Sequence, residues 1–459
     1  MSVTAINTRR ALTGPALCVV VLTSASWLQA ADTVVGKFNG PGGCAASACH
    51  GSIQPKAAAR VPQNEYTIWA GQDRHARAYQ VLSNSVSLRM AKILKLEKPA
   101  NQTPRCLACH ALAPPQEQRA ESFNVDDGVS CEHCHGPASG WLGAHTLRGW
   151  ENQSAADKAR LGMTDLRDVA VRTHNCLQCH LGTEAKFVDH ELIAAGHPDL
   201  TFELNLFSTV MPRHWKDPVD SKGAAWFGAR EWAVGQGMQL QDSLHRLSRR
   251  ARSSTWPEYS EMDCFACHHS LSKPDESWRL VSDGYYGSRK AGVPAWNAAR
   301  YIVFRYAARE VDAAAASKLE SEIGMLTSLM NQLSGDKEKI AAAAESAASS
   351  ADTLARELNS KSYDGAFTLR VMRHIAGDSR PISEQGQRAA GQAAMSLDSL
   401  FGAYRQNAKT ANENEVRAAI NALFQLLDNP SAYNAPQFAA QMQKVEALLS
   451  REGSSGGGN

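Results

Sequence analysis

The chain has 459 residues, which is enough for two or three domains. Its formal net charge of +2 gives no support to a nucleic-acid-binding role. No run after residue 30 approaches the roughly 20 apolar residues that a membrane-spanning helix needs.

Residues 1–30 have the pattern of a secretory signal peptide. Arg9 and Arg10 precede an apolar run from Ala11 to Leu28, and Ala30 ends a passable cleavage site. The alternative is a membrane anchor, but polar and turn-forming residues interrupt the run, which favours cleavage. Cleavage takes away two arginines and no acid, which leaves 46 basic and 46 acidic residues. We therefore expect an exported, periplasmic protein.

Cysteine spacing is the most informative feature of the rest of the chain. Of eleven cysteines, Cys18 lies in the signal segment, and the other ten form five close pairs, each followed at once by a histidine. The five motifs are Cys44/Cys49/His50, Cys106/Cys109/His110, Cys131/Cys134/His135, Cys176/Cys179/His180 and Cys264/Cys267/His268. No cysteine is left over for a disulfide.

The order C-x-x-C-H is the attachment signature of c-type haem. The two thiols add to the haem vinyl groups, and the adjacent histidine is the proximal iron ligand. Disulfides and zinc binding are the alternatives for close cysteine pairs, but neither explains a histidine after every pair. The sequence therefore predicts five covalently attached haem c groups.

The first motif, CAASACH, has four residues between its cysteines instead of two. Attachment through both thiols requires only that the loop bulges. A single thioether through Cys49, with Cys44 free, is the alternative. The lack of another partner for Cys44 favours full attachment.

Five irons need sixth ligands, and three histidines are the strongest candidates. His75 lies in a segment from Tyr66 to Leu96 that the apolar spacing predicts to be helical. His145 follows a Gly-Pro turn after the third motif, on a segment that could fold back over a haem, and His197 lies in AAGHPDLTFEL. Weaker candidates are His174 and His190, with a surface or haem-propionate role as the alternative, then His214 and His245, and His269 as a ligand of a neighbouring haem. His133 lies inside its own motif, and we expect it to point away.

The composition changes after about residue 300. All cysteines and tryptophans lie before this point, and only His374 among the histidines lies after it. Apolar residues recur at helical spacing, at Leu319, Ile323, Leu326, Met330 and Leu333. Breaks at 334–336, 363–365, 377–381 and 429–430 predict about five or six helices in an antiparallel bundle. We expect the Ala-rich run 340–351 to form a solvated helix face.

The motifs in the first 300 residues resemble the cytochrome c-554 family of multihaem c-type cytochromes. The matching features are HARAY around His75, VSCEHCHGP leading to His145, and CLQCH followed by AAGHPDLTFEL, spread over residues 38–270. The resemblance implies distal ligation by His75, His145 and His197, close haem packing and periplasmic electron transfer. The family's named member has four haems, whereas this chain offers five sites.

These observations predict a mainly α fold with little regular strand. We expect a signal peptide over 1–30, a haem-packed pentahaem cytochrome domain over 31–300, an α-helical bundle over 301–452 and a disordered tail over 453–459. The most economical function is electron transfer to and from redox protein partners, through mostly bis-histidine haems. The alternative is an oxidoreductase acting on nitrite, hydroxylamine or nitric oxide at an iron with an open site, although no C-x-x-C-K motif is present. The bundle either covers haem edges or docks to a membrane oxidoreductase or to a second copy of the chain.

Overall fold

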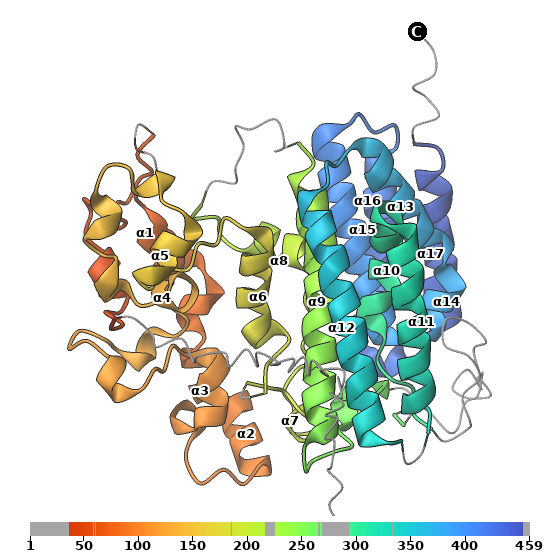
Figure 1. Cartoon of the computed structure of the whole chain (residues 1–459), viewed down its shortest axis with the longest axis horizontal. Coiled ribbons are helices and arrows are strands. Elements are labelled where there is room, and N and C mark those ends of the chain that lie inside the picture. The colour runs from red at the N-terminus through yellow and green to blue at the C-terminus, as the bar shows by residue number, and fades with distance from the viewer. Residues whose placement is uncertain are drawn as a thin grey trace, which may run out of the picture. The chain divides into compact units, whose positions relative to one another are not determined.

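The structure is a computed structural model that describes residues 36–452, except 58, 60, 185, 216–224, 265, 266, 269–292, 333 and 334. The expected signal peptide and C-terminal tail, and His269 and Leu333, lie outside the described residues. The described part is mainly α-helical, as predicted, and its β structure consists of isolated bridges between Phe38 and Arg119 and between Met262 and Trp296 (Figure 1). None of its helices is long and apolar enough to cross a membrane.

Short helices and 3-10 turns make up the region that carries the first four motifs. Its helices are α1 (Glu65–Gln72), α2 (Ser85–Ile93), α3 (Pro104–His110), α4 (Cys131–His135), α5 (Ala155–Arg160), α6 (Val169–His180), α7 (His190–Ala194) and α8 (Leu204–Val210). The expected helix from Tyr66 to Leu96 is broken into α1, two 3-10 turns and α2. The break falls at Asp73, whose backbone is extended (ψ 131°) and whose carboxylate accepts a hydrogen bond from the backbone N–H of His75. An aspartate that caps the next turn in this way ends the preceding helix.

Longer helices follow and pack as a bundle. They are α9 (Phe227–Arg252), α10 (Ala299–Val311), α11 (Ala313–Met330), α12 (Lys337–Ser360), α13 (Gly365–Gly377), α14 (Ser379–Glu384), α15 (Gln387–Asn407), α16 (Glu413–Gln425) and α17 (Ala435–Leu449). Each of the four predicted breaks coincides with the junction of two helices; Asp336 and Asp364 are N-caps of α12 and α13. The eight helices named after residue 298 exceed the expected five or six, because further breaks at Asp312, at Gly386 and over 408–412 carry weaker turn signals.

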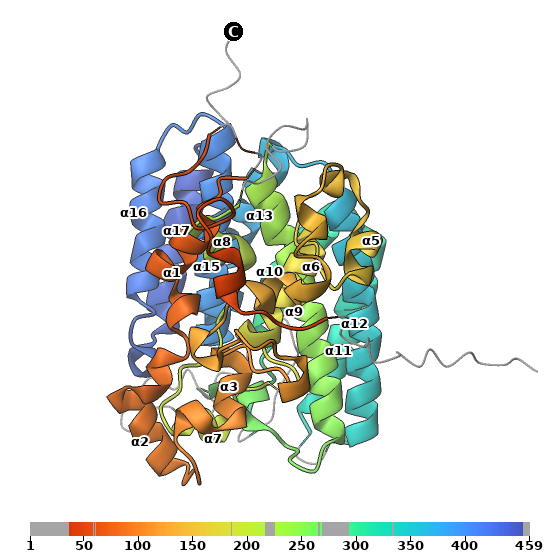
Figure 2. The ribbon, with the colours of Figure 1, turned by 90° about the vertical axis from the view of Figure 1, so that its left-hand side faces the viewer.

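The pairing of α9 with α12 corrects the expectation for the Ala-rich run. Figures 1 and 2 show the two helices side by side, and they have the most extensive contact of any two elements. Ala341, Ala344 and Ala348 are fully buried, so this face is not solvated. Small side chains on both helices allow the close approach: a Cβ added at Gly237 of α9 would lie 2.8 Å from the Cβ of Ala355 of α12.

The bundle is joined to the haem-motif region through α6 and α8, both of which pack on α9. The Arg172 guanidinium of α6 lies 2.7 Å from the Glu231 carboxylate of α9, which is buried. One apolar core is continuous from Val169 to Leu449. Helix α9 precedes the expected domain boundary at residue 300, but its contacts make it part of the bundle.

Candidate haem sites

Three attachment motifs lie on helices. Cys106, Cys109 and His110 end α3, the third motif forms α4, and Cys176, Cys179 and His180 end α6. Residues three and four apart share a helix face, so each such helix presents both thiols and the imidazole to the same side. This is the arrangement that two thioether bonds and one iron ligand require.

The first motif lies in turns rather than on an α-helix. A 3-10 turn covers Pro41–Cys44, and the backbone N–H of His50 donates to the carbonyl of Cys44 at 3.2 Å. The two extra residues thus close a wider loop, as expected. Gly51 follows, and a Cβ there would lie 1.8 Å from the Ala45 carbonyl oxygen, so only glycine fits this tight return. Attachment through Cys44 remains a prediction.

Four of the five proximal histidines face a second imidazole. The ring centroids are 6.1 Å apart for His50 and His145, 6.1 Å for His180 and His75, 6.4 Å for His110 and His197, and 6.1 Å for His268 and His190. Metal–nitrogen bonds of about 2 Å on either side of one iron put two imidazole centroids roughly 6 Å apart. The residues present therefore fit a six-coordinate haem iron at each of these four sites.

In five of these eight histidines, the Nδ1 ring nitrogen has a hydrogen-bond partner in the protein. His50 Nδ1 lies 2.9 Å from the Glu65 carboxylate, and His75 Nδ1 lies 3.0 Å from Asp73. Backbone carbonyl oxygens accept from the same atom at the other sites: Ala78 at 2.9 Å from His110, Leu142 at 2.6 Å from His145 and Pro198 at 2.7 Å from His197. With Nδ1 donating, Nε2 is left free for a metal, which is how ligating histidines are usually oriented.

Electrostatics distinguish the histidines beside carboxylates from the rest. The hydrogen bond to Glu65 raises the pKa of His50, and the hydrogen bond to Asp73 raises the pKa of His75, although burial opposes both shifts. Burial lowers the pKa of His180 and of His197. Sequence reasoning missed both carboxylates; the Asp-x-His pattern around His75 is the one available signal.

The third motif differs from the other four. No ring among the described residues faces His135 at the spacing of the four pairs. Burial, followed by His214 and His50, lowers the pKa of His135 to about 4. His214 is therefore a neighbour, but its Nδ1 lies 3.4 Å from the Pro212 carbonyl and its ring contacts Trp215 at 5.1 Å.

The remaining histidines have other surroundings. His174 pairs with Asp242 and His245 with Glu345, and neither ring faces a proximal histidine. His133 has a buried Nδ1 without a hydrogen-bond partner, and the His133 ring lies against the Cys179 thiol. His190, only a weak candidate from sequence, faces His268.

One comparison with known proteins bears on the first part of the chain. Residues 44–136 match the family model described as cytochrome c554 and c-prime. The chain is a c-type cytochrome, and residues 44–136 are similar to the cytochrome c-554 family. The match covers the first three motifs and His75 and confirms the resemblance there, and it implies covalently bound haem c. No curated protein and no solved structure matches the chain.

The cysteines of this cytochrome are grouped across motifs. All ten from Cys44 to Cys267 are free, so the disulfide alternative finds no support. The Cys131 thiol lowers the pKa of Cys44, and the Cys179 thiol raises the pKa of Cys109, so the members of each pair lie close enough to interact. The first motif therefore adjoins the third, and the second adjoins the fourth.

Aromatic rings flank several of the cytochrome's candidate axial ligands. Phe202 stacks on His180 with centroids 5.1 Å apart, and Phe207 meets the same imidazole edge-on at 5.3 Å. Trp141 lies 5.3 Å from His145, and Tyr259 lies 5.8 Å from His190. These rings fix the imidazole orientation and restrict the access of water to the ligands.

Proposed function

We propose that this cytochrome carries electrons through five covalently attached haems, at least four of which have two histidine ligands. The haem iron supplies the chemistry, because it takes up and releases one electron. The observation that carries the proposal is the set of four histidine pairs at 6.1–6.4 Å. Two protein ligands on one iron leave no position for a substrate, which favours electron transfer over catalysis at these sites.

The thiol contacts between motifs support close haem packing. The thiols of Cys44 and Cys131, from the first and third motifs, shift each other's pKa, as do those of Cys109 and Cys179, from the second and fourth. The charge of Cys179 also contributes, after burial, to the raised pKa of Cys134, so the third and fourth motifs lie near each other as well. Groups attached at adjoining cysteines must lie near one another, and closeness is the main requirement for electron exchange between them.

A second function rests on the third motif. His135 has no facing imidazole among the described residues, so an iron bound there is the best candidate for an open axial position. Such an iron would suit a small nitrogen compound, namely nitrite, hydroxylamine or nitric oxide. We rank this reading below electron transfer because it concerns one site of five.

Cellular location and partners are part of the same proposal. The N-terminal pattern of Arg9, Arg10 and the apolar run supports export to the periplasm. Electrons would come from one redox protein and pass to another, and the bundle offers a surface for docking to a membrane oxidoreductase. Deleting whole helices would expose its continuous core, so surface substitutions on the bundle are the better test of docking.

The decisive experiment is electron paramagnetic resonance on the oxidised holoprotein, with iron and haem counted on the same sample. We expect five haems, with low-spin signals from the four paired sites. His145→Ala should convert one low-spin iron to high-spin, whereas His174→Ala, the matched control, should change nothing. A high-spin signal in the parent that shifts with nitrite or nitric oxide would support the second function. Four haems would exclude attachment at the first motif, and an unchanged spectrum in His145→Ala would contradict the pairing.

A further inference from the structure

A small cavity lies where the fourth and fifth motifs approach the bundle. Its lining includes Leu181 next to His180, Asp199 near His197, and four arginines, Arg246, Arg250, Arg300 and Arg388. The cavity volume is about 30 Å³. One water needs about 10–15 Å³, so the cavity admits a carboxylate-sized group but not a porphyrin ring.

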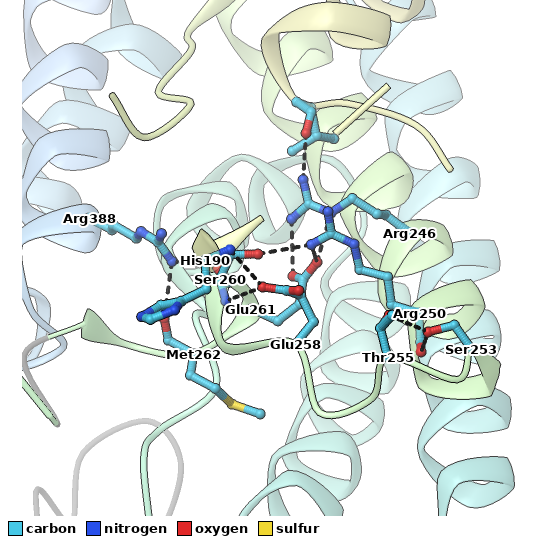
Figure 3. Close-up of polar contacts among 11 residues, drawn as sticks. His190, Arg246, Arg250, Ser253, Thr255, Glu258, Ser260, Glu261, Met262 and Arg388 are labelled. Atoms are coloured by element: carbon cyan, nitrogen blue, oxygen red, sulfur yellow. Dashed lines mark hydrogen bonds and ion pairs between the residues drawn. The ribbon is translucent and has the colours of Figure 1, made fainter. Parts of the chain in front are cut away.

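Three of the arginines are already paired, as Figure 3 shows for their contacts with Glu261 and with backbone. Arg246 donates to Glu261 at 2.8 and 3.0 Å, and Arg250 donates to Glu261 at 2.6 Å. Arg388 pairs with Asp199 and donates to the Met262 carbonyl at 3.1 Å. These pairs neutralise both carboxylates that line or adjoin the cavity.

Arg300 is different, because it has no partner among the described residues. No hydrogen bond or ion pair joins its side chain to any of them, and its Nε is buried without a partner. Burial, followed by the charge of Arg246, lowers the pKa of Arg300 to about 9. Glu258, whose charge acts on Arg250, accepts at Oε1 from the backbone N–H groups of His190 and Ser260, at 3.0 and 2.9 Å.

A buried donor such as the Arg300 Nε is costly when it has no partner, and an anion would supply the missing acceptor. We propose that Arg300, supported by its arginine neighbours, binds a carboxylate, and that a haem propionate supplies it. The inference rests on the proposed haem sites. The planar guanidinium matches a carboxylate with two parallel hydrogen bonds. A free inorganic oxyanion has the same chemistry and is the other source to be tested.

The position of the cavity favours a propionate. Leu181, whose carbonyl accepts from Arg246 at 2.6 Å, directly follows the proximal His180. Burial raises the pKa of the Cys264 thiol of the fifth motif, and the charge of Arg388 opposes this rise, so Arg388 lies close to that motif. Haem attached at either motif would bring acidic groups to this part of the protein without any diffusing ligand.

The test uses full-length holoprotein whose haem propionate carboxyls carry ¹³C. Infrared difference spectra between oxidised and reduced protein would be compared for the parent, Arg300→Met, Arg300→Lys and Arg356→Met, an exposed arginine on α12 that serves as the control. We expect one labelled carboxylate band to move in Arg300→Met and less in Arg300→Lys, and none to move in the control. The reduction equilibrium constant of one haem should fall about tenfold in Arg300→Met, a potential lower by about 59 mV, because a positive charge that favours the reduced state is lost.

Calorimetric titration with inorganic phosphate distinguishes the two sources. A moved labelled band with no phosphate binding supports the propionate. Unmoved bands, with one phosphate bound by the parent but not by Arg300→Met, assign the cavity to a free oxyanion and overturn the propionate. Unmoved bands without phosphate binding overturn the site altogether. Each sample would first be shown to hold five haems, because a lower count would contradict the proposed function and not this inference. If Arg300→Met does not fold, the comparison is made with Arg300→Lys.

Discussion

Replacing Asp73 with asparagine should raise the reduction potential of one haem, the one attached at the fourth motif. The Asp73 carboxylate lies 3.0 Å from His75 Nδ1, and the His75 ring faces the proximal His180. A carboxylate at this position makes the imidazole a stronger electron donor and stabilises the oxidised iron. Asparagine keeps the size of the side chain but removes its charge.

The magnitude follows from the burial of Asp73. The side chain is only 2% exposed, so solvent screens its charge weakly. A hydrogen bond to a charged group contributes about 1.5–3 kcal/mol, and only part of this differs between the two oxidation states. If about 1.4 kcal/mol differs, the potential rises by about 60 mV, since 59 mV is tenfold for one electron.

Potentiometric titration followed by visible spectroscopy would measure the change. The matched control is Asp242→Asn, which removes a carboxylate at the same 3.0 Å from Nδ1 of His174, a histidine that faces no proximal ligand. We expect one step of the titration to move in Asp73→Asn and none in Asp242→Asn. Equal curves for the two variants would show that His75 does not act on an iron through this hydrogen bond.

Two further predictions concern the bundle and its junction. Gly237→Ala should destabilise the protein by about 1–3 kcal/mol, because its Cβ would lie 2.8 Å from a side chain of α12; Gly391→Ala, with nothing within 4 Å, should stabilise it by up to about 1 kcal/mol. Thermal unfolding of both variants checks this, and equal shifts would contradict the close packing. Burial alone would raise the pKa of Glu261, but Arg246 and Arg250 outweigh it and lower the pKa to about 2. The stabilisation of the fold by the Glu261 carboxylate is therefore complete above the unfolded pKa near 4.5 and is lost as the pH falls toward 2. Glu261→Gln should be less stable than the parent at pH 7 by about 3–5 kcal/mol, and its stability should depend less steeply on acid pH. An acid-unfolding profile equal to that of the parent would count against the pairing.

The sequence predicts more of the chemistry of the sites than of their geometry. Attachment motifs are local, so the sequence predicts five candidate sites, and helix caps such as Asp336 and Asp364 mark the bundle breaks. The facing of His190 and His268 is a contact between distant segments, and chain spacing says nothing about which rings meet. For the same reason the Ala-rich run was assigned wrongly: small residues have a weak hydrophobic pattern, and only the close approach of α9 shows why they are buried.

The two halves of the described chain differ in what holds them together. In the bundle, large apolar side chains such as Phe304, Phe401 and Leu354 are fully buried in one core. The region of the first three motifs has only a small separate cluster, formed by Ala138, Trp141 and Trp150. Each histidine pair, by contrast, joins segments far apart in the sequence, so an iron bound between them would close a long loop and stabilise the fold. We therefore expect the bundle to keep its helices without haem while the region of the first three motifs loses its structure. Hydrogen exchange measured segment by segment would show this difference, whereas total helicity alone would not.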